Sequence, residues 1–172
     1  MTCTFFGHRD VPPELEPVLQ AALTQLTERR QVCRFLVGNQ GGFDRMALRV
    51  LRRLCKTHPG LQVSVVLAYN PGRLPPRAAR EDNTWLFPEA LENVPPRFAI
   101  DRRNRWMLSQ AEYVVTFVQA TVGGAAKYRA LALRQGKRVL DLAARVPPAG
   151  SPQHEPYAEV QNAGEHHDEH GI

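Results

Sequence analysis

The chain has 172 residues, of which 43% are apolar and 23% are charged, values near those of ordinary globular proteins. This length predicts one domain with a buried core and does not favour two domains. No apolar run approaches the roughly 20 residues that a membrane helix needs, and the first residues lack the layout of a signal peptide. We therefore expect a cytoplasmic protein with no membrane partner.

The charge is distributed unevenly along the chain. All 22 basic residues but only 12 of the 17 acidic residues lie in residues 1–145, so this part carries a formal net charge of +10, against +5 for the whole chain. Residues 146–172 contain no Lys or Arg, five acidic residues and four prolines, a composition typical of a solvated tail. A basic folded part favours phosphorylated small molecules or nucleic acid as partners, although a solubilising surface also explains the excess.

Cysteine and histidine give no sign of a metal centre. The three cysteines are odd in number, far apart and without CxxC spacing, which predicts neither a disulfide framework nor a zinc site (Cys3, Cys33 and Cys55). Four of the six histidines lie in the acidic tail, and the three near its end (His166, His167 and His170) have no preorganised geometry for a metal. We expect no metal, and no cofactor other than a nucleotide-like ligand.

Short β-prone runs alternate with segments of helical spacing. The runs predict strands over residues 2–6, 33–37, 61–68, 113–118 and 138–142. The helical stripes lie at residues 15–26, 46–54, 100–111 and 126–133, the last ending before Gly136. Residues 61–68 are almost uninterruptedly apolar, which predicts a central strand covered on both faces. The proline-rich stretch 69–96 predicts a long irregular excursion.

This alternation predicts a single Rossmann-like α/β domain over residues 1–145. Its sheet is expected to be doubly wound, mainly parallel and five-stranded, with helices on both faces. In such a sheet all strands end at the same edge, and ligands bind in the crevice outside that edge. Residues that directly follow the strands are therefore the first candidates for a binding site.

Glycine-containing loops follow three of the predicted strands. They are Gly7-His8-Arg9, the run Gly38-Asn39-Gln40-Gly41-Gly42 that leads through Phe43 to Asp44, and Gly123-Gly124. Because glycine has no Cβ, it permits positive φ and a close approach of backbone N–H groups to a bulky anion. The dipole of the following helix favours a phosphate at the same place. We expect the three loops to converge on one ligand, although each loop alone is also explained as a tight turn.

Polar side chains in the first two loops extend this hypothesis. Arg9 can clamp a phosphate, and His8 can donate or exchange a proton, with a salt bridge and an exposed imidazole as the alternatives. Asp44 can accept a hydrogen bond from a ribose hydroxyl, or it can cap the second helix. Both interpretations of Asp44 remain open at this point.

Two later segments add candidates. Asn104 shares a predicted helix stripe with apolar residues, so it is either a buried structural bridge or part of the crevice lining, and Arg103 is placed to reach the same space. The flanking arginines at 102 and 105 are expected to face solvent. Lys127 and Tyr128 are placed to meet a phosphate and to stack on a base, with surface and core packing as the alternatives.

The order of these motifs resembles the SLOG superfamily of Rossmann-like proteins, and within it the YpsA-type branch. The likeness covers residues 1–145 and rests on Gly7-His8-Arg9, the glycine-rich loop ending in Asp44, Arg103-Asn104 with Met107, and Gly123-Gly124. It implies a phosphate-binding Rossmann-like frame. Members of the superfamily include DprA, which binds single-stranded DNA, and the LONELY GUY phosphoribohydrolases, which cleave an N-glycosidic bond of a nucleotide.

The sequence departs from the phosphoribohydrolases at one informative place. Their glycine pair leads into a catalytic glutamate, whereas Gly124 is followed here by Ala-Ala-Lys-Tyr-Arg. Cleavage of a glycosidic bond needs an acid or base near the anomeric carbon, so the resemblance implies the frame without the hydrolase, and no catalytic residue is assigned.

Three functional hypotheses follow from the sequence. The leading one is the binding or sensing of a nucleotide or nucleotide-derived phosphorylated ligand. The second is a phosphoribohydrolase that uses Asp44 or a loop acid such as Glu81, Asp82 or Glu89. The third is single-stranded nucleic-acid binding, for which the excess of arginine argues. A homodimer is an open alternative for a domain of this size.

Overall fold

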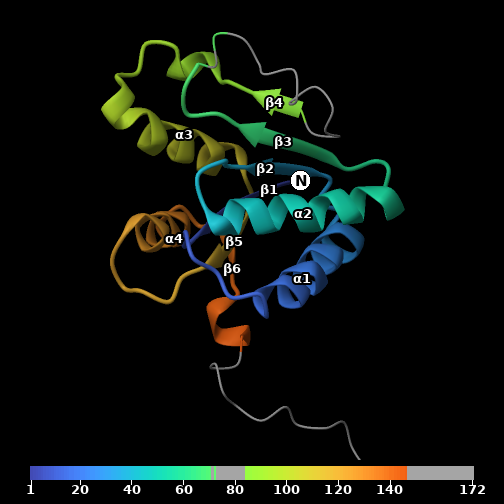
Figure 1. The fold of residues 1–172 in the computed structure, drawn as a ribbon. Helices are drawn as coiled ribbons and strands as arrows, with labels where there is room; N and C mark the ends of the chain where they lie inside the picture. The colour runs from blue at the N-terminus through green and yellow to red at the C-terminus, as the bar shows by residue number, and fades with distance from the viewer. Residues whose placement is uncertain (71, 73–83, 147–172) are drawn as a thin grey trace, which may run out of the picture.

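The computed structural model describes residues 1–70, 72 and 84–146 as one α/β unit (Figure 1). The acidic tail from residue 147 and most of the proline-rich stretch lie outside the described residues. The strands are β1 (Thr2–Gly7), β2 (Arg34–Val37), β3 (Gln62–Val66), β4 (Thr84–Leu86), β5 (Tyr113–Phe117) and β6 (Arg138–Asp141). The helices are α1 (Leu15–Arg30), α2 (Gly42–Thr57), α3 (Pro96–Gln110) and α4 (Gly124–Arg134), with short 3-10 turns at Glu89–Leu91 and Ala143–Arg145.

The strands form one parallel sheet in the order β4-β3-β2-β1-β5-β6. Thr4 of β1 lies opposite Leu36 of β2 on one side and opposite Val114 of β5 on the other. From β1 the chain builds outward to β4 and then returns to the other side of β1 to form β5. The direction of winding therefore reverses between β1 and β5, where sheets of this type bind ligands.

Helices cover both faces of the sheet, as Figure 1 shows for α1 and α2 on one side and α3 and α4 on the other. Adjacent aromatic residues of β1 illustrate the two layers. Phe5 belongs to the core formed with α1 and α2, and Phe6 belongs to the core formed with α3 and α4. Successive strand residues point to opposite faces, so this one strand contributes to both cores. The predicted doubly wound, Rossmann-like class is confirmed.

Three details of the predicted fold are wrong. The sheet has six strands instead of five, because the three residues of β4 pair with β3 inside the stretch expected to be irregular. β3 is consequently covered at its outer edge, but it lies next to the last strand and not at the centre. Helix α4 begins at Gly124, two residues earlier than predicted, since its first turn carries small residues without an apolar stripe.

The buried face of α3 is also displaced from its predicted position. We expected Ile100, Met107 and Leu108 to share the apolar stripe, with Asn104 as a buried bridge or part of the crevice lining. Met107 and Leu108 are buried and Asn104 is half-buried at the cavity, but Ile100 is 39% exposed. The buried residues are Ala99, Arg103, Met107 and Leu108. Arg103 can occupy this face because its guanidinium reaches a main-chain acceptor at the end of β3.

Candidate functional site

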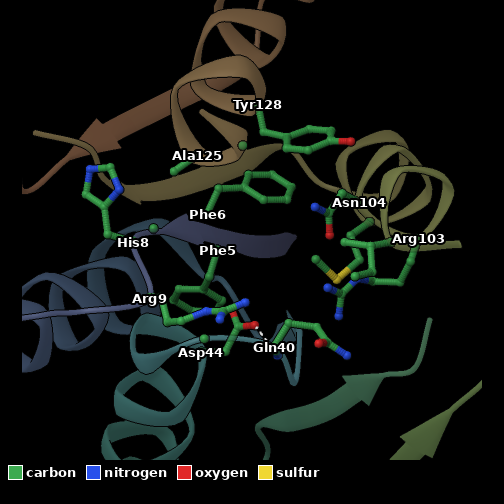
Figure 2. Close-up of a pocket in the computed structure, with 15 residues that line it drawn as sticks. Phe5, Phe6, His8, Arg9, Gln40, Asp44, Arg103, Asn104, Ala125 and Tyr128 are labelled. Carbon is green, nitrogen blue, oxygen red and sulfur yellow. Dashed lines mark hydrogen bonds between the residues drawn. The ribbon is translucent and has the colours of Figure 1, made fainter. Parts of the chain in front are cut away.

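A cavity of about 300 Å³ lies where β1 and β2 end, between these strands and the helices α3 and α4. All three predicted glycine loops contribute to its wall, as do side chains from α3 that Figure 2 shows extending toward it. The predicted residues that line the cavity are Gly7, His8, Arg9, Gln40, Gly41, Asp44, Arg103, Asn104 and Gly124. The predicted residues outside the lining are Gly38, Asn39, Gly42, Gly123 and Lys127.

The loop between β2 and α2 uses the amides that directly precede and begin the helix within the chain itself. The N–H of Gly42 donates to the carbonyl of Arg9 at 2.9 Å, and the N–H of Phe43 donates to the carbonyl of His8 at 3.3 Å. The N–H of Gln40 donates to the Asp44 carboxylate at 3.0 Å. These amides are therefore not the free N–H groups that we expected to hold an anion, because they bind the chain itself.

Glycine is required in this loop for space and not for a positive φ. Among the described glycines, φ is positive at 72, 123 and 136, all outside the loop. A Cβ on Gly42 would lie 2.2 Å from the carbonyl oxygen of Arg9. A Cβ on Gly38 would lie 2.5 Å from Asp44 Oδ2 and 2.7 Å from Arg103 Nη1. The two glycines let the loop after β1 and the Arg103 guanidinium pack against the start of α2.

The N-terminus of α4 presents unpaired backbone N–H groups at the cavity. Gly123 precedes the helix with φ of 107°, a conformation that side chains rarely adopt. The first intrahelical bond runs from Lys127 N to Gly123 O, and the N–H groups of residues 124, 125 and 126 have no acceptor in the part of the chain that the structure describes. Gly124 and Ala125 line the cavity, so unpaired donors and the positive end of the helix dipole lie at its wall.

Arg103 is an arginine in an unusual environment. It is 2% exposed, and its Nη1 donates to the carbonyl of Val66 at 3.0 Å. Its buried Nε has no hydrogen-bond partner. Burial lowers the pKa of the guanidinium, and the nearby Asp44 carboxylate opposes this effect. A buried donor without an acceptor is costly, and the guanidinium adds a positive charge to this side of the cavity.

Asp44 is held by its own loop. Its carboxylate accepts the N–H groups of Gln40 and Gly41, and burial raises its pKa although Arg103 lies close by. Asp44 is the third residue of α2. The N-cap residue of this helix is Gly41, which has no side chain to form a capping hydrogen bond. The predicted cap role is therefore replaced by a related one, in which the carboxylate fixes the turn before the helix.

His8 and Arg9 have different roles although they are adjacent. The Nε2 atom of His8 accepts the N–H groups of Gln119 at 2.9 Å and Ala120 at 3.3 Å. The ring is then the tautomer with its proton on Nδ1, and it joins the loop after β1 to the loop after β5. Arg9 is exposed and has no side-chain partner within the described ranges, and Figure 2 shows its side chain among those that surround the cavity.

Lys127 is not free to meet a phosphate. Its Nζ forms an ion pair with Asp101, whose carboxylate also accepts the Tyr128 hydroxyl at 2.6 Å. The hydrogen bond from Lys127 holds the pKa of Asp101 well below its usual range. The ring of Tyr128 stacks on Phe6 with centroids 4.9 Å apart, and Asn104 lies beside it in the lining. Tyr128 and Asn104 therefore both support the cavity wall and form part of it.

Sequence reasoning missed the apolar part of the lining. It consists of Phe5, Phe6, Ile100, Met107 and Ala125. All of these belong to predicted strands or helices, where an apolar residue is interpreted as core. The signal that could have found them is position: Phe5 and Phe6 directly precede Gly7, and Ile100 and Met107 flank Arg103 on the same helix.

The described residues hold no group of metal-ligating side chains, and the tail histidines lie outside them. No helix in residues 1–70 or 84–146 is both long and apolar enough to cross a lipid bilayer. Of the acids proposed for hydrolysis, Asp44 lines the cavity, whereas Glu89 is exposed and absent from its lining. Glu81 and Asp82 fall in the undescribed stretch.

Comparison with known proteins gives a likeness of fold. No protein-family model matches the chain, and no curated protein matches its sequence. A similar solved structure is that of DNA processing protein A (DprA) from Streptococcus pneumoniae, with a TM-score of 0.58 and 16% sequence identity. The match covers 81% of this chain and 49% of the DprA chain, so this chain spans about half the length of DprA. The chain thus has the Rossmann-like α/β fold found in DprA.

Proposed function

We propose that the cavity binds a phosphorylated, nucleotide-like ligand. The observation that carries this proposal is that two groups of hydrogen-bond donors without acceptors belong to the lining of the same cavity. One is the guanidinium of Arg103, which lines the cavity and whose Nε has no hydrogen-bond partner, and the other is the first turn of α4, where Gly124 and Ala125 line the cavity. A guanidinium and the N–H groups of a helix N-terminus are both donors that phosphate oxygens satisfy.

The remaining wall suits the sugar and base of such a ligand. Phe6 and Tyr128 present stacked aromatic rings, and Ile100 and Met107 add apolar surface. The Asp44 carboxylate keeps acceptor capacity for a hydroxyl group of a sugar. A volume of about 300 Å³ is at the small end of ligand pockets, which favours one nucleotide unit over a dinucleotide.

The charge of the lining agrees with an anionic ligand. Its charged residues are Arg9, Arg103 and Asp44, which give a formal net charge of +1. Arg9 supplies an exposed guanidinium that can form a bidentate pair with phosphate on entry. The same residues carry the resemblance to the YpsA-type branch of the SLOG superfamily, and membership in that branch is part of this proposal.

Calorimetric titration of the full chain tests the proposal. The panel consists of nucleoside 5′-monophosphates, ADP-ribose and pyridine dinucleotides, with the unphosphorylated nucleosides and inorganic phosphate as separate arms. We expect a nucleotide to bind and its nucleoside to bind much more weakly. Arg9→Ala should weaken nucleotide binding by roughly 10- to 100-fold, the loss of a charge-assisted hydrogen bond of about 1.5–3 kcal/mol.

The matched control is Arg134→Ala, an exposed arginine in the last turn of α4, which should change the affinity by less than about twofold. No heat from any phosphorylated compound, or equal losses in the two variants, would contradict the proposal. Chromatography of the same samples for free base tests the hydrolase alternative. Base release that Asp44→Ala abolishes would favour a phosphoribohydrolase.

A second candidate function is the binding of single-stranded nucleic acid. One observation favours it: Phe98 of α3 is 47% exposed, with the guanidinium of Arg97 4.7 Å from its ring centroid. Exposed aromatic rings beside cations are the elements that bind unpaired bases and backbone phosphates. The fold likeness to a DNA processing protein is consistent with this candidate. It predicts an oligonucleotide affinity that falls steeply with salt and that Phe98→Ala reduces.

A further inference from the structure

A second cavity, of about 360 Å³, shares no residue with the ligand cavity. It lies between the C-terminal half of α1 and the edge strand β6. Leu26 of α1 and Leu140 of β6 belong to its apolar lining, and Tyr113 of β5 contributes a hydroxyl. Three arginines from three separate elements complete it: Arg30, Arg138 and Arg145. We call this site the arginine cavity.

The arginine cavity has no negative charge in its lining. The guanidinium of Arg138 donates to the Tyr113 hydroxyl at 2.6 Å and lies 5.3 Å from the centroid of the Tyr113 ring, so it is held in place. Arg30 and Arg145 are exposed and have no side-chain partner in the described part of the chain. Three cations around an apolar floor repel one another, and an anionic occupant with some apolar surface would relieve this repulsion.

The edge of the sheet is open at the same place. β6 is the last strand, and it pairs only with β5 among the described strands. The outer edge of such a strand presents unpaired backbone groups that can bind an extended peptide. The arginine cavity therefore combines a positive charge with an available sheet edge, which suits an acidic peptide better than a compact anion.

An acidic peptide is attached directly beside the cavity. Arg145 is one of its walls, and the chain continues through Val146 into a segment with five acidic residues and no Lys or Arg. The first two of these acids are Glu155 and Glu159. Nine residues beyond Val146 can span up to ~30 Å, whereas a four-residue strand is ~13 Å long, so Glu155 has ample reach. A tether this short gives an effective concentration on the order of millimolar.

We propose that the arginine cavity binds the acidic tail of the same chain, through the carboxylates of Glu155 and Glu159. The contact is an ionic one between the tail and Arg30, Arg138 and Arg145, above the apolar floor at Leu26 and Leu140. It covers the open edge of β6 and offsets part of the +10 charge of residues 1–145. This inference is independent of the ligand cavity and does not depend on what that cavity binds.

Carbodiimide cross-linking of the full chain tests it, because the reagent joins carboxylates to amines that are in contact. The chain has only three lysines, at 56, 127 and 137. Arg138→Lys places an amine in the arginine cavity without loss of charge, and Arg134→Lys places one on α4, on the other face of the sheet, as the matched control. Peptide mass spectrometry then identifies the linked residues.

We expect intramolecular links from position 138 to Glu155 or Glu159, in yields roughly tenfold above those from position 134. The yield should fall strongly at about 1 M salt, where the Debye length is near 3 Å. Adding Arg30→Ala and Arg145→Ala to the Arg138→Lys chain should lower the yield as well, because these exposed residues attract the tail without reacting.

Equal yields at positions 134 and 138, or a yield at position 138 that salt does not change, would overturn the proposal. Links formed only between two chains would overturn it too, because they would assign the cavity to the tail of a second copy. A lower yield of intramolecular links when an acidic peptide is present before the reagent is added, and a recovered yield when that mixture is diluted before the reaction, would support the ionic contact.

Discussion

Two ionisable residues of opposite charge, Asp44 and Arg103, line the ligand cavity and lie close to Gly38. The space that a Cβ would occupy there is taken by Asp44 Oδ2 and Arg103 Nη1. Burial acts against the charged form of each, raising the pKa of Asp44 and lowering the pKa of Arg103. Neither group is ideally solvated without a ligand, which is typical of residues in binding sites.

The raised pKa of Asp44 predicts a pH dependence of stability. The folded chain retains this proton at pH values where the unfolded chain has already released it, since the unfolded pKa is about 3.9. Ionised Asp44 therefore costs stability as the pH rises from about 4 through the raised pKa. Asp44→Asn removes this titration, so the free energy of unfolding of the variant minus that of the wild type should increase over this window.

Urea denaturation at a series of pH values measures this difference. Asp10→Asn, an exposed aspartate of the loop after β1, is the control for removal of a negative charge. If the free energy of unfolding of Asp44→Asn minus that of the wild type stayed constant or decreased from pH 4 upward, the raised pKa of Asp44 would be contradicted.

Single residues also show where sequence reasoning stops. It could identify Gly7, Arg9, Asp44 and Gly124 as cavity residues, because position after a strand is visible in the pattern. It could not decide that Arg103 is buried, since the acceptor is the main-chain carbonyl of Val66, 37 positions away. It also could not foresee that Lys127 pairs with Asp101 of another helix.

Between elements, the loops after β1 and β2 form one interlocked unit. The carbonyls of His8 and Arg9 accept the first two N–H groups of α2, and the His8 ring accepts two N–H groups from the loop after β5. The end of β1 thus connects both neighbouring strands at the switch point. This arrangement holds the cavity wall in place without help from a ligand.

Gly42→Ala tests the interlock. The new Cβ would lie 2.2 Å from the carbonyl oxygen of Arg9, a main-chain atom that can move only with the whole loop. We expect a loss of about 1–3 kcal/mol in the free energy of unfolding, as for other overpacked sites, together with weaker nucleotide binding. Gly60→Ala is the control, because nothing lies within 4 Å of its added Cβ. Equal denaturation midpoints for the two variants would show that the loops move apart without cost.

Most elements could be predicted from side-chain periodicity, and the exceptions have a common cause. β4 has only three residues, none of them buried, and it exists because its main chain pairs with β3. The first turn of α4 is made of glycine and alanine and owes its start to Gly123. Both elements depend on backbone geometry, and the pattern of apolar residues in the sequence carries no information about it.

At the scale of the whole molecule, the fold places one cavity at the reversal of winding and gives the described part a strongly basic character. The site is assembled from four stretches of sequence that are distant along the chain but end at the same edge of the sheet. The same architecture in DprA shows that the fold is shared, and the nature of the ligand rests on the residues of this chain.

The most direct measurement of the central claim is an amide NMR titration of the full chain with a nucleoside 5′-monophosphate. We predict saturable shifts at the N–H groups of Gly124 and Ala125, because they are unpaired donors at the cavity wall, and at Ala126, whose N–H is unpaired in the same turn. Gly42 and Phe43 should respond less, since their N–H groups are bound to the loop after β1. An unchanged α4 N-terminus, or shifts centred on the exposed Phe98 of α3, would contradict the account.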